Sequence, residues 1–150
     1  MPVIEESVFI ARPPQDVFDF ISDPNNIPVW DASVVKAEQV GSGPVGVGTR
    51  THGTSKIMGT HFDWTTEQTE FDPPTRAVIK SIDGRMSFTV TNMLEPVEGG
   101  TNFTYRVDAA AGLGGIFGRL ADPFIERAQA RTVRANLATL AELLAEPPST

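Results

Sequence analysis

Residues 10–18 read Ile10-Ala11-Arg12-Pro13-Pro14-Gln15-Asp16-Val17-Phe18, and this stretch contains the junction between a strand and a helix. Before it, apolar and polar side chains alternate, which predicts a strand over residues 3–12. The two prolines end this strand, and Pro14 suits the first turn of a helix because that position needs no backbone N–H donor. Apolar residues then recur at helical spacing, so a short amphipathic helix is expected over residues 14–22.

The chain beyond this helix divides into a strand-rich part and a helical end. A second short helical turn is expected to lead to Trp30. Six strands are predicted between Val34 and Ala110, because tight Gly and Pro turns separate runs with one apolar face each. Such turns favour an antiparallel meander. A helix is predicted over residues 116–145, with Pro123 as a kink or as its true start, and one domain of class α+β is expected over residues 1–150.

Composition excludes several classes of function. The formal net charge of −7 opposes binding to the phosphate backbone of nucleic acids. The absence of cysteine excludes disulfides, thiolate nucleophiles and cysteine-ligated metals. The sequence has no apolar run long enough to span a bilayer and no signal-peptide pattern at its start, so a cytoplasmic protein without integral membrane association is expected.

The predicted C-terminal helix changes character along one face. Its second half carries an apolar stripe that is typical of a core helix. The same stripe is more polar nearer the N-terminus, where it includes Asp122, Ile125, Glu126, Gln129 and Asn136. Either these side chains are solvated where the helix emerges from the sheet, or they cover a cavity in which they orient a ligand or water.

The predicted sheet has an inner face that is mostly apolar. Continuing the alternation of each strand places these residues there: Trp64, Gln68, Met86, Phe88, Val90, Asn92, Leu94, Phe103, Tyr105 and Val107. The amide of Asn92 must find a partner on this face, either a ligand or water or a neighbouring side chain such as Gln129. Tyr105 is a candidate proton donor, although a buried tyrosine more often only packs. Glu126 is a candidate base if burial raises its pKa.

A metal site is not favoured. His52, His61 and Asp63 form a conceivable trio, but Phe62 and Trp64 fit the inner face, which leaves His61 and Asp63 on the solvent side by alternation. No metal and no cofactor are expected.

The order of these elements resembles the helix-grip fold of the START, polyketide cyclase and pollen-allergen superfamily (SRPBCC), and in particular its small bacterial polyketide cyclase-like members. Five segments and a terminal leucine-rich helix carry the resemblance. The segments are residues 10–18, Pro28-Val29-Trp30, Val45-Gly46-Val47-Gly48-Thr49, Glu70-Phe71-Asp72-Pro73-Pro74 and Gly99-Gly100-Thr101. The resemblance implies a curved seven-stranded antiparallel sheet, two short helices after the first strand, and a long C-terminal helix over a hydrophobic cavity.

The fold leaves three functions open. The first is binding of a small hydrophobic molecule, such as a lipid, an isoprenoid or an aromatic polyketide, between the sheet and the C-terminal helix. The second is a cyclase, aromatase or dehydrase, with Tyr105 and Glu126 as candidate catalytic residues. The third is a protein-interaction module. The expected ligand-binding residues are Trp64, Phe88, Asn92, Tyr105, Ile125 and Gln129, and the sequence does not indicate an oligomeric state.

Overall fold

The computed structural model describes residues 3–57, 59–84, 87–109 and 123–145, with the backbone alone at residues 57, 84, 109 and 123–126. The helices are α1 (Pro14–Ser22), the 3-10 turn η1 (Pro24–Asn26), α2 (Ile27–Trp30) and α3 (Pro123–Ala145). The strands are β1 (Val3–Ile10), β2 (Val34–Val40), β3 (Arg50–Ile57), β4 (Thr60–Asp72), β5 (Arg76–Gly84), β6 (Phe88–Val97) and β7 (Gly100–Ala109).

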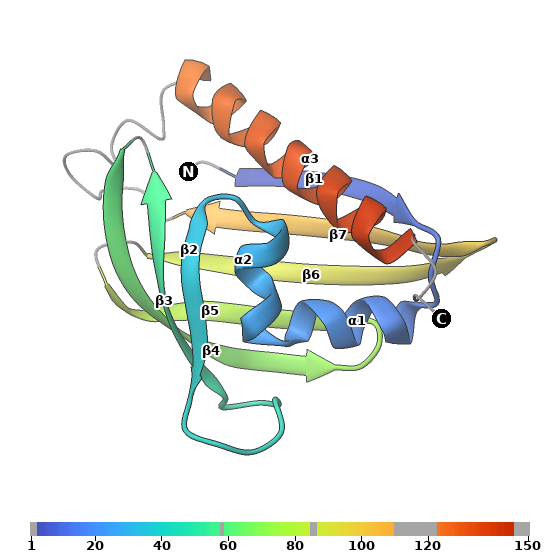
Figure 1. Ribbon diagram of the computed structural model, residues 1–150, viewed down its shortest axis with the longest axis horizontal. Coiled ribbons are helices and arrows are strands. Elements are labelled where there is room, and N and C mark those ends of the chain that lie inside the picture. Colours follow the sequence, from blue (N-terminus) through green and yellow to red (C-terminus); the bar gives the residue numbers. More distant parts are fainter. Residues whose placement is uncertain (1–2, 58, 85–86, 110–122, 146–150) are drawn as a thin grey trace.

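One antiparallel sheet contains all seven strands in the order β1-β7-β6-β5-β4-β3-β2. Consecutive strands from β2 to β7 are neighbours, and β1 pairs with β7 at one edge of the sheet. The sheet curves around α1 and α2, while α3 runs along β1 (Figure 1). The predicted helix-grip architecture is therefore confirmed, although residues 116–122 of the predicted C-terminal helix lie outside the described residues.

Proline and aspartate set the local structure before β2. Pro14 opens α1 directly after Pro13, and the side chain of Asp23 accepts a hydrogen bond from the backbone N–H of Asn25 at the start of η1. The helix α2 has only four residues, and its last backbone bond runs from the N–H of Asp31 to the carbonyl of Ile27 over 2.9 Å. Asp31 therefore lies at the point where the chain leaves the helix and turns into β2.

The core lies between the concave face of the sheet and the helices. The apolar stripe of α3 packs there with α1, and the residues of this cluster come from every layer: Ile10, Val17, Phe18, Ile21, Trp30, Ala77, Leu94, Phe103, Leu137, Leu140 and Leu144. Several hydroxyl and amide side chains are also buried, and among them Thr101 is fully buried and donates to the carbonyl of Arg12 over 2.8 Å. Within the described residues, no helix is long and apolar enough to cross a membrane.

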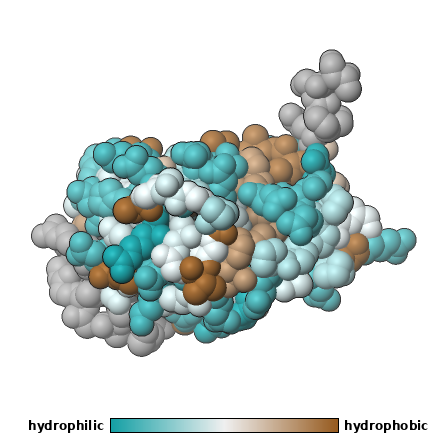
Figure 2. Space-filling view, turned by 90° about the horizontal axis from the view of Figure 1, so that it is seen from below, coloured by the Kyte–Doolittle hydropathy of each residue, from teal (hydrophilic) through white to brown (hydrophobic). Residues whose placement is uncertain are grey.

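The exposed apolar side chains are dispersed. They belong to different strands, to helices and to the turn before β3: Phe9, Val29, Val35, Val40, Val47, Ile82, Val97 and Leu143. On the face shown in Figure 2, hydrophobic residues form several groups among hydrophilic ones. The described surface therefore gives no specific support for the protein-interaction module.

Candidate functional site

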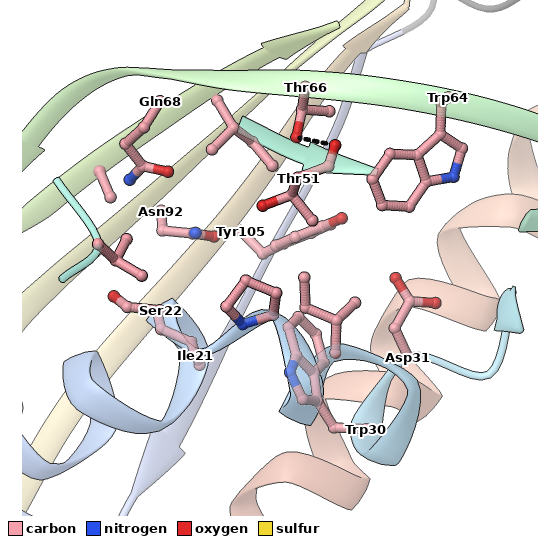
Figure 3. A pocket seen from close by; sticks show the side chains of 15 residues that line it. Ile21, Ser22, Trp30, Asp31, Thr51, Trp64, Thr66, Gln68, Asn92 and Tyr105 are labelled. Atoms are coloured by element: carbon pink, nitrogen blue, oxygen red, sulfur yellow. Dashed lines mark hydrogen bonds between the residues drawn. The ribbon is translucent and has the colours of Figure 1, made fainter. Parts of the chain in front are cut away.

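A cavity lies between the concave face of the sheet and the segment from α1 to α2 (Figure 3). The space that the centres of water molecules can reach amounts to about 80 Å³. The lining is mixed, with apolar side chains beside polar ones: Ile21, Ser22, Pro24, Ile27, Trp30, Asp31, Val45, Thr51, Trp64, Thr66, Gln68, Ala77, Ile79, Asn92 and Tyr105. None of the described side chains of α3 belongs to this lining.

Asp31 is a buried carboxylate at the edge of this cavity, with 9% of its surface exposed. Its Oδ1 atom accepts three hydrogen bonds, from the backbone N–H of Ser33 (2.9 Å), the hydroxyl of Ser33 (2.7 Å) and the amide Nδ2 of Asn136 (3.1 Å). Its Oδ2 atom has no hydrogen-bond partner among the described residues. Burial raises the pKa of Asp31 above its ordinary value, and the bonds from Ser33 and Asn136 oppose this increase.

Asn136 connects the long helix to this carboxylate. It is 7% exposed and lies on the face of α3 that also carries Leu137 and Leu140. While its Nδ2 donates to Asp31, its Oδ1 accepts from the backbone N–H of Ala32 over 3.2 Å. Asn136 therefore does not line the cavity itself but holds Asp31, which does, in a fixed orientation.

Tyr105 projects from β7 into the middle of the cavity (Figure 3). Its ring packs edge-to-face on Trp30, with ring centroids 5.8 Å apart and planes at 90°. Its hydroxyl makes no hydrogen bond within the described structure. Burial raises the pKa of the Tyr105 phenol well above its ordinary value, and the negative charge of Asp31 raises it further.

Two further polar atoms of the lining residues are buried without a hydrogen-bond partner in the part of the chain that the structure describes. These are the indole Nε1 of Trp30 and the amide Oδ1 of Asn92. Such atoms cost about 1–3 kcal/mol each when nothing pairs them. Asn92 therefore does not bond to Gln129, the neighbouring side chain that the sequence suggested as its partner.

Trp64 lines the cavity on the side opposite Trp30 (Figure 3), and its neighbours fix its orientation. Its indole N–H donates to the hydroxyl of Ser55 over 2.8 Å, in a buried bond. Gly53 pairs with Trp64 across β3 and β4, and a Cβ atom at Gly53 would collide with the indole ring. The ring therefore presents carbon atoms rather than its N–H to the cavity.

The structure brings some of the sequence-predicted residues together and separates others. Trp64, Asn92 and Tyr105 line the cavity. Phe88 does not, although its ring packs edge-to-face on Trp64 with centroids 6.4 Å apart. Gln129 is half-buried on α3 outside the lining, and the side chains of Ile125 and Glu126 lie outside the described residues.

Sequence reasoning missed Asp31 altogether and missed the role of Asn136. The only local signal at Asp31 is a Ser two residues later, and this pattern is also that of an ordinary turn in which the Asp side chain bonds the backbone. Burial of the carboxylate depends on a helix about a hundred residues away in the chain, as the separation of 105 between the two bonded residues shows.

The conceivable trio of metal ligands is not assembled. His61 and Asp63 are exposed on the convex face of β4, as alternation predicts, and Asp63 accepts a hydrogen bond from Thr54. His52 pairs with Thr65 in the sheet register, whereas His61 pairs with Lys56. Among the described residues, no three His, Asp or Glu side chains gather as a metal site.

Comparisons with known proteins agree with this architecture. The family described as "Polyketide cyclase / dehydrase and lipid transport" matches residues 1–145. No curated protein matches the sequence. The structure is similar to that of the protein TTHA0849 from Thermus thermophilus, with a TM-score of 0.79 and 23% identity over 95% of this chain and 97% of that one.

Two other solved structures show the same fold at lower identity. The Zhui aromatase/cyclase from Streptomyces sp. R1128 has a TM-score of 0.75 and 17% identity, over 95% of this chain and 92% of that one. A START superfamily protein from Mycobacterium smegmatis has a TM-score of 0.75 and 13% identity, over 95% and 96%. The predicted SRPBCC superfamily is thus confirmed, and with a match over residues 1–145 the chain belongs to the family of polyketide cyclases, dehydrases and lipid transport proteins.

Proposed function

We propose that this protein binds a small, largely apolar compound with one polar group in the cavity between the sheet and the segment from α1 to α2. The observation that carries the proposal is the coexistence of apolar walls with unpaired polar atoms. Within the described structure, the hydroxyl of Tyr105 and the Oδ2 atom of Asp31 have no hydrogen-bond partner, and both residues line the cavity beside apolar side chains. A ligand that pairs them would recover the free energy that their burial costs.

The dimensions of the cavity limit the part of the ligand that it encloses. A space of about 80 Å³ for the centres of water molecules has room for several waters, and hence for a compact group of a ligand rather than for a long chain. An aromatic ring system, a short isoprenoid or the polar end of a lipid is of this size. The relatives named above, an aromatase/cyclase and a START protein, are consistent with such ligands.

Intrinsic fluorescence offers a direct test, because the only two tryptophans of the chain, Trp30 and Trp64, both line the cavity. A panel of aromatic, isoprenoid and acyl compounds should be titrated while tryptophan emission is followed, and retained compounds should be identified by native mass spectrometry. We expect one class to bind with a saturable change in emission. The proposal is abandoned if no compound of the panel is retained.

A matched pair of variants locates the binding. Ala77→Leu adds three carbon atoms to a buried residue of the cavity lining, whereas Ala138→Leu makes the same change at an exposed position of α3. We expect the first variant to weaken binding and the second to leave it unchanged. Circular dichroism checks that both variants remain folded. Equal affinity in both variants would place the ligand elsewhere.

A second function, catalysis of a cyclase or dehydrase type, is favoured by the presence of Asp31 and Tyr105 in the lining of one cavity. A carboxylate whose pKa is raised by burial is a stronger base toward a carbon acid, and a neutral phenol can donate a hydrogen bond to the carbonyl oxygen as negative charge develops on it. An aromatic polyketone mimic incubated with the protein should then lose water, and Asp31→Asn should abolish this turnover while Tyr105→Phe lowers it. Unchanged turnover in Asp31→Asn would refute the catalytic role.

A further inference from the structure

We infer that the ligand of this cavity carries a positively charged amino group, which binds the carboxylate of Asp31, on an apolar body that lies among the aromatic side chains. This inference rests on the proposed ligand-binding function and names the chemical class of the ligand. The cavity encloses the carboxylate of Asp31, for which the described residues provide no counter-ion.

The two oxygen atoms of Asp31 have different roles. Oδ1 receives all three hydrogen bonds, two from Ser33 and one from Asn136, and these bonds hold the side chain in a fixed orientation. Oδ2 receives none within the described structure, and Asp31 is part of the cavity lining. Figure 3 shows the carboxylate facing the same space as the Tyr105 ring and Trp64. One oxygen atom is therefore anchored, and the other is available to a bound molecule.

No described residue of the lining neutralises this charge. The fifteen lining residues include no Lys, Arg or His, and the described ion pairs all involve other carboxylates. A carboxylate that is nine-tenths buried without a cation is costly, and a cationic ligand would remove that cost. Burial accordingly raises the pKa of Asp31, whereas the hydrogen bonds from Ser33 and Asn136 favour its charged form.

Aromatic rings line the same cavity as the carboxylate. Trp30 and Tyr105 meet edge-to-face with centroids 5.8 Å apart, and Trp64 lies across the cavity from Trp30 (Figure 3). Because its N–H is bonded to Ser55, Trp64 cannot turn this donor to a ligand without losing a buried bond. The π faces of Trp and Tyr attract cations, and most strongly where water is excluded. A carboxylate beside these rings is an environment for an ammonium group.

The remaining features of the cavity fit the same ligand. The apolar side chains of Ile21, Ile27 and Ile79 provide walls for a hydrocarbon or aromatic body. The net charge of −7 raises the local concentration of cations around the protein.

Three probes that differ only in the polar group test this inference with the intact protein: 2-phenylethylamine, 2-phenylethanol and ethylbenzene. Each dissociation constant is measured at pH 7 by NMR titration. We expect the amine to bind wild-type protein about tenfold or more tightly than the alcohol. If the alcohol binds as tightly as the amine, the inference is overturned while the ligand-binding function stands. If none of the three binds, the binding function fails for ligands of this size, and the inference fails with it.

Two isosteric substitutions separate the local charge from the net charge. Asp31→Asn should bring the amine and the alcohol to within about twofold of each other, because it removes the charge and keeps the shape. Asp72→Asn changes an exposed aspartate at the end of β4 and should leave the preference for the amine intact. An undiminished preference for the amine in a folded Asp31→Asn protein contradicts the inference. If Asp31→Asn does not fold, the ratio of the dissociation constants of the amine and the alcohol for the wild-type protein still tests the inference.

Discussion

The amide of Asn136 donates a hydrogen bond from Nδ2 to Oδ1 of Asp31 over 3.1 Å and accepts another at Oδ1 from the backbone N–H of Ala32 over 3.2 Å. Through this pair, the long helix α3 fixes the carboxylate that follows α2. The bond joins two elements that lie far apart in the sequence, and it determines where Asp31 points, the only charged side chain among the described residues of the cavity lining.

Asn136→Ala should lower the free energy of unfolding by about 1–3 kcal/mol, because a charged acceptor loses one of its three donors and a partly buried N–H loses its acceptor. Urea unfolding followed by circular dichroism measures this change. Arg131→Ala, at an exposed position of the same helix, should change the stability by less than about 0.5 kcal/mol. Equal stability of Asn136→Ala and wild type would show that the bond to Asp31 contributes nothing.

The sequence predicted the parts of this site that a strand's alternation determines. Trp64, Asn92 and Tyr105 each belong to a run with one apolar face, so their inward direction follows from period two alone. Asp31 could not be found in this way, because it follows a four-residue helix and has no periodic context. Its burial results from the packing of α3 against the region around α2, and local patterns do not encode contacts between such distant segments.

The same distinction explains Phe88 and Gln129. Phe88 was correctly assigned to the inner face, but inner-face position alone does not decide whether a side chain lines a cavity or packs against a neighbour such as Trp64. Gln129 and Asn136 lie on one stripe of α3, yet only Asn136 is opposite a polar partner. The sequence therefore indicated which faces meet, and the three-dimensional packing decided which polar residues are paired.

The single tyrosine of the chain allows the environment of Tyr105 to be measured without ambiguity. Burial, and secondly the charge of Asp31, raise the pKa of its phenol above the ordinary value of 10.0. A near-ultraviolet pH titration should show no phenolate at pH values where a free tyrosine is half ionised, until the protein unfolds. Asp31→Asn should lower this pKa but leave it above 10.0, since burial is the larger cause. Ionisation of wild-type Tyr105 near pH 10 in the folded state would disprove the assignment.

The raised pKa of Asp31 predicts how stability depends on pH. The unfolded chain releases the proton of this group near its ordinary pKa of 3.8, whereas the native protein keeps it to a higher pH. Between these two pKa values the native state binds more protons, so the contribution of Asp31 to stability decreases as the pH rises and becomes constant above the folded pKa. Relative to wild type, Asp31→Asn should therefore gain stability as the pH rises from about 4 through this window.

Urea unfolding of both proteins at a series of pH values from 3 to 7 measures this difference. Taking the difference between the two proteins cancels the titration of the other carboxylates, which Asp31→Asn leaves in place. A difference in stability that is independent of pH would mean that folding does not shift the pKa of Asp31. A difference that falls as the pH rises would mean that folding lowers it.

Gly53 provides a test of the Trp64 wall that does not alter any polar group. A Cβ atom at this position would collide with the indole ring and would lie 2.7 Å from the carbonyl oxygen of Lys36, so neither β3 nor Trp64 could stay in place. Gly53→Ala should destabilise the protein by about 1–3 kcal/mol and shift tryptophan emission as the ring moves. Gly46→Ala is the matched control, because a Cβ atom there meets nothing within 4 Å and its backbone is not in the left-handed region. If Gly53→Ala keeps both the stability and the emission of wild type, the ring of Trp64 is not held against β3, and the wall of the cavity at that end must be formed differently.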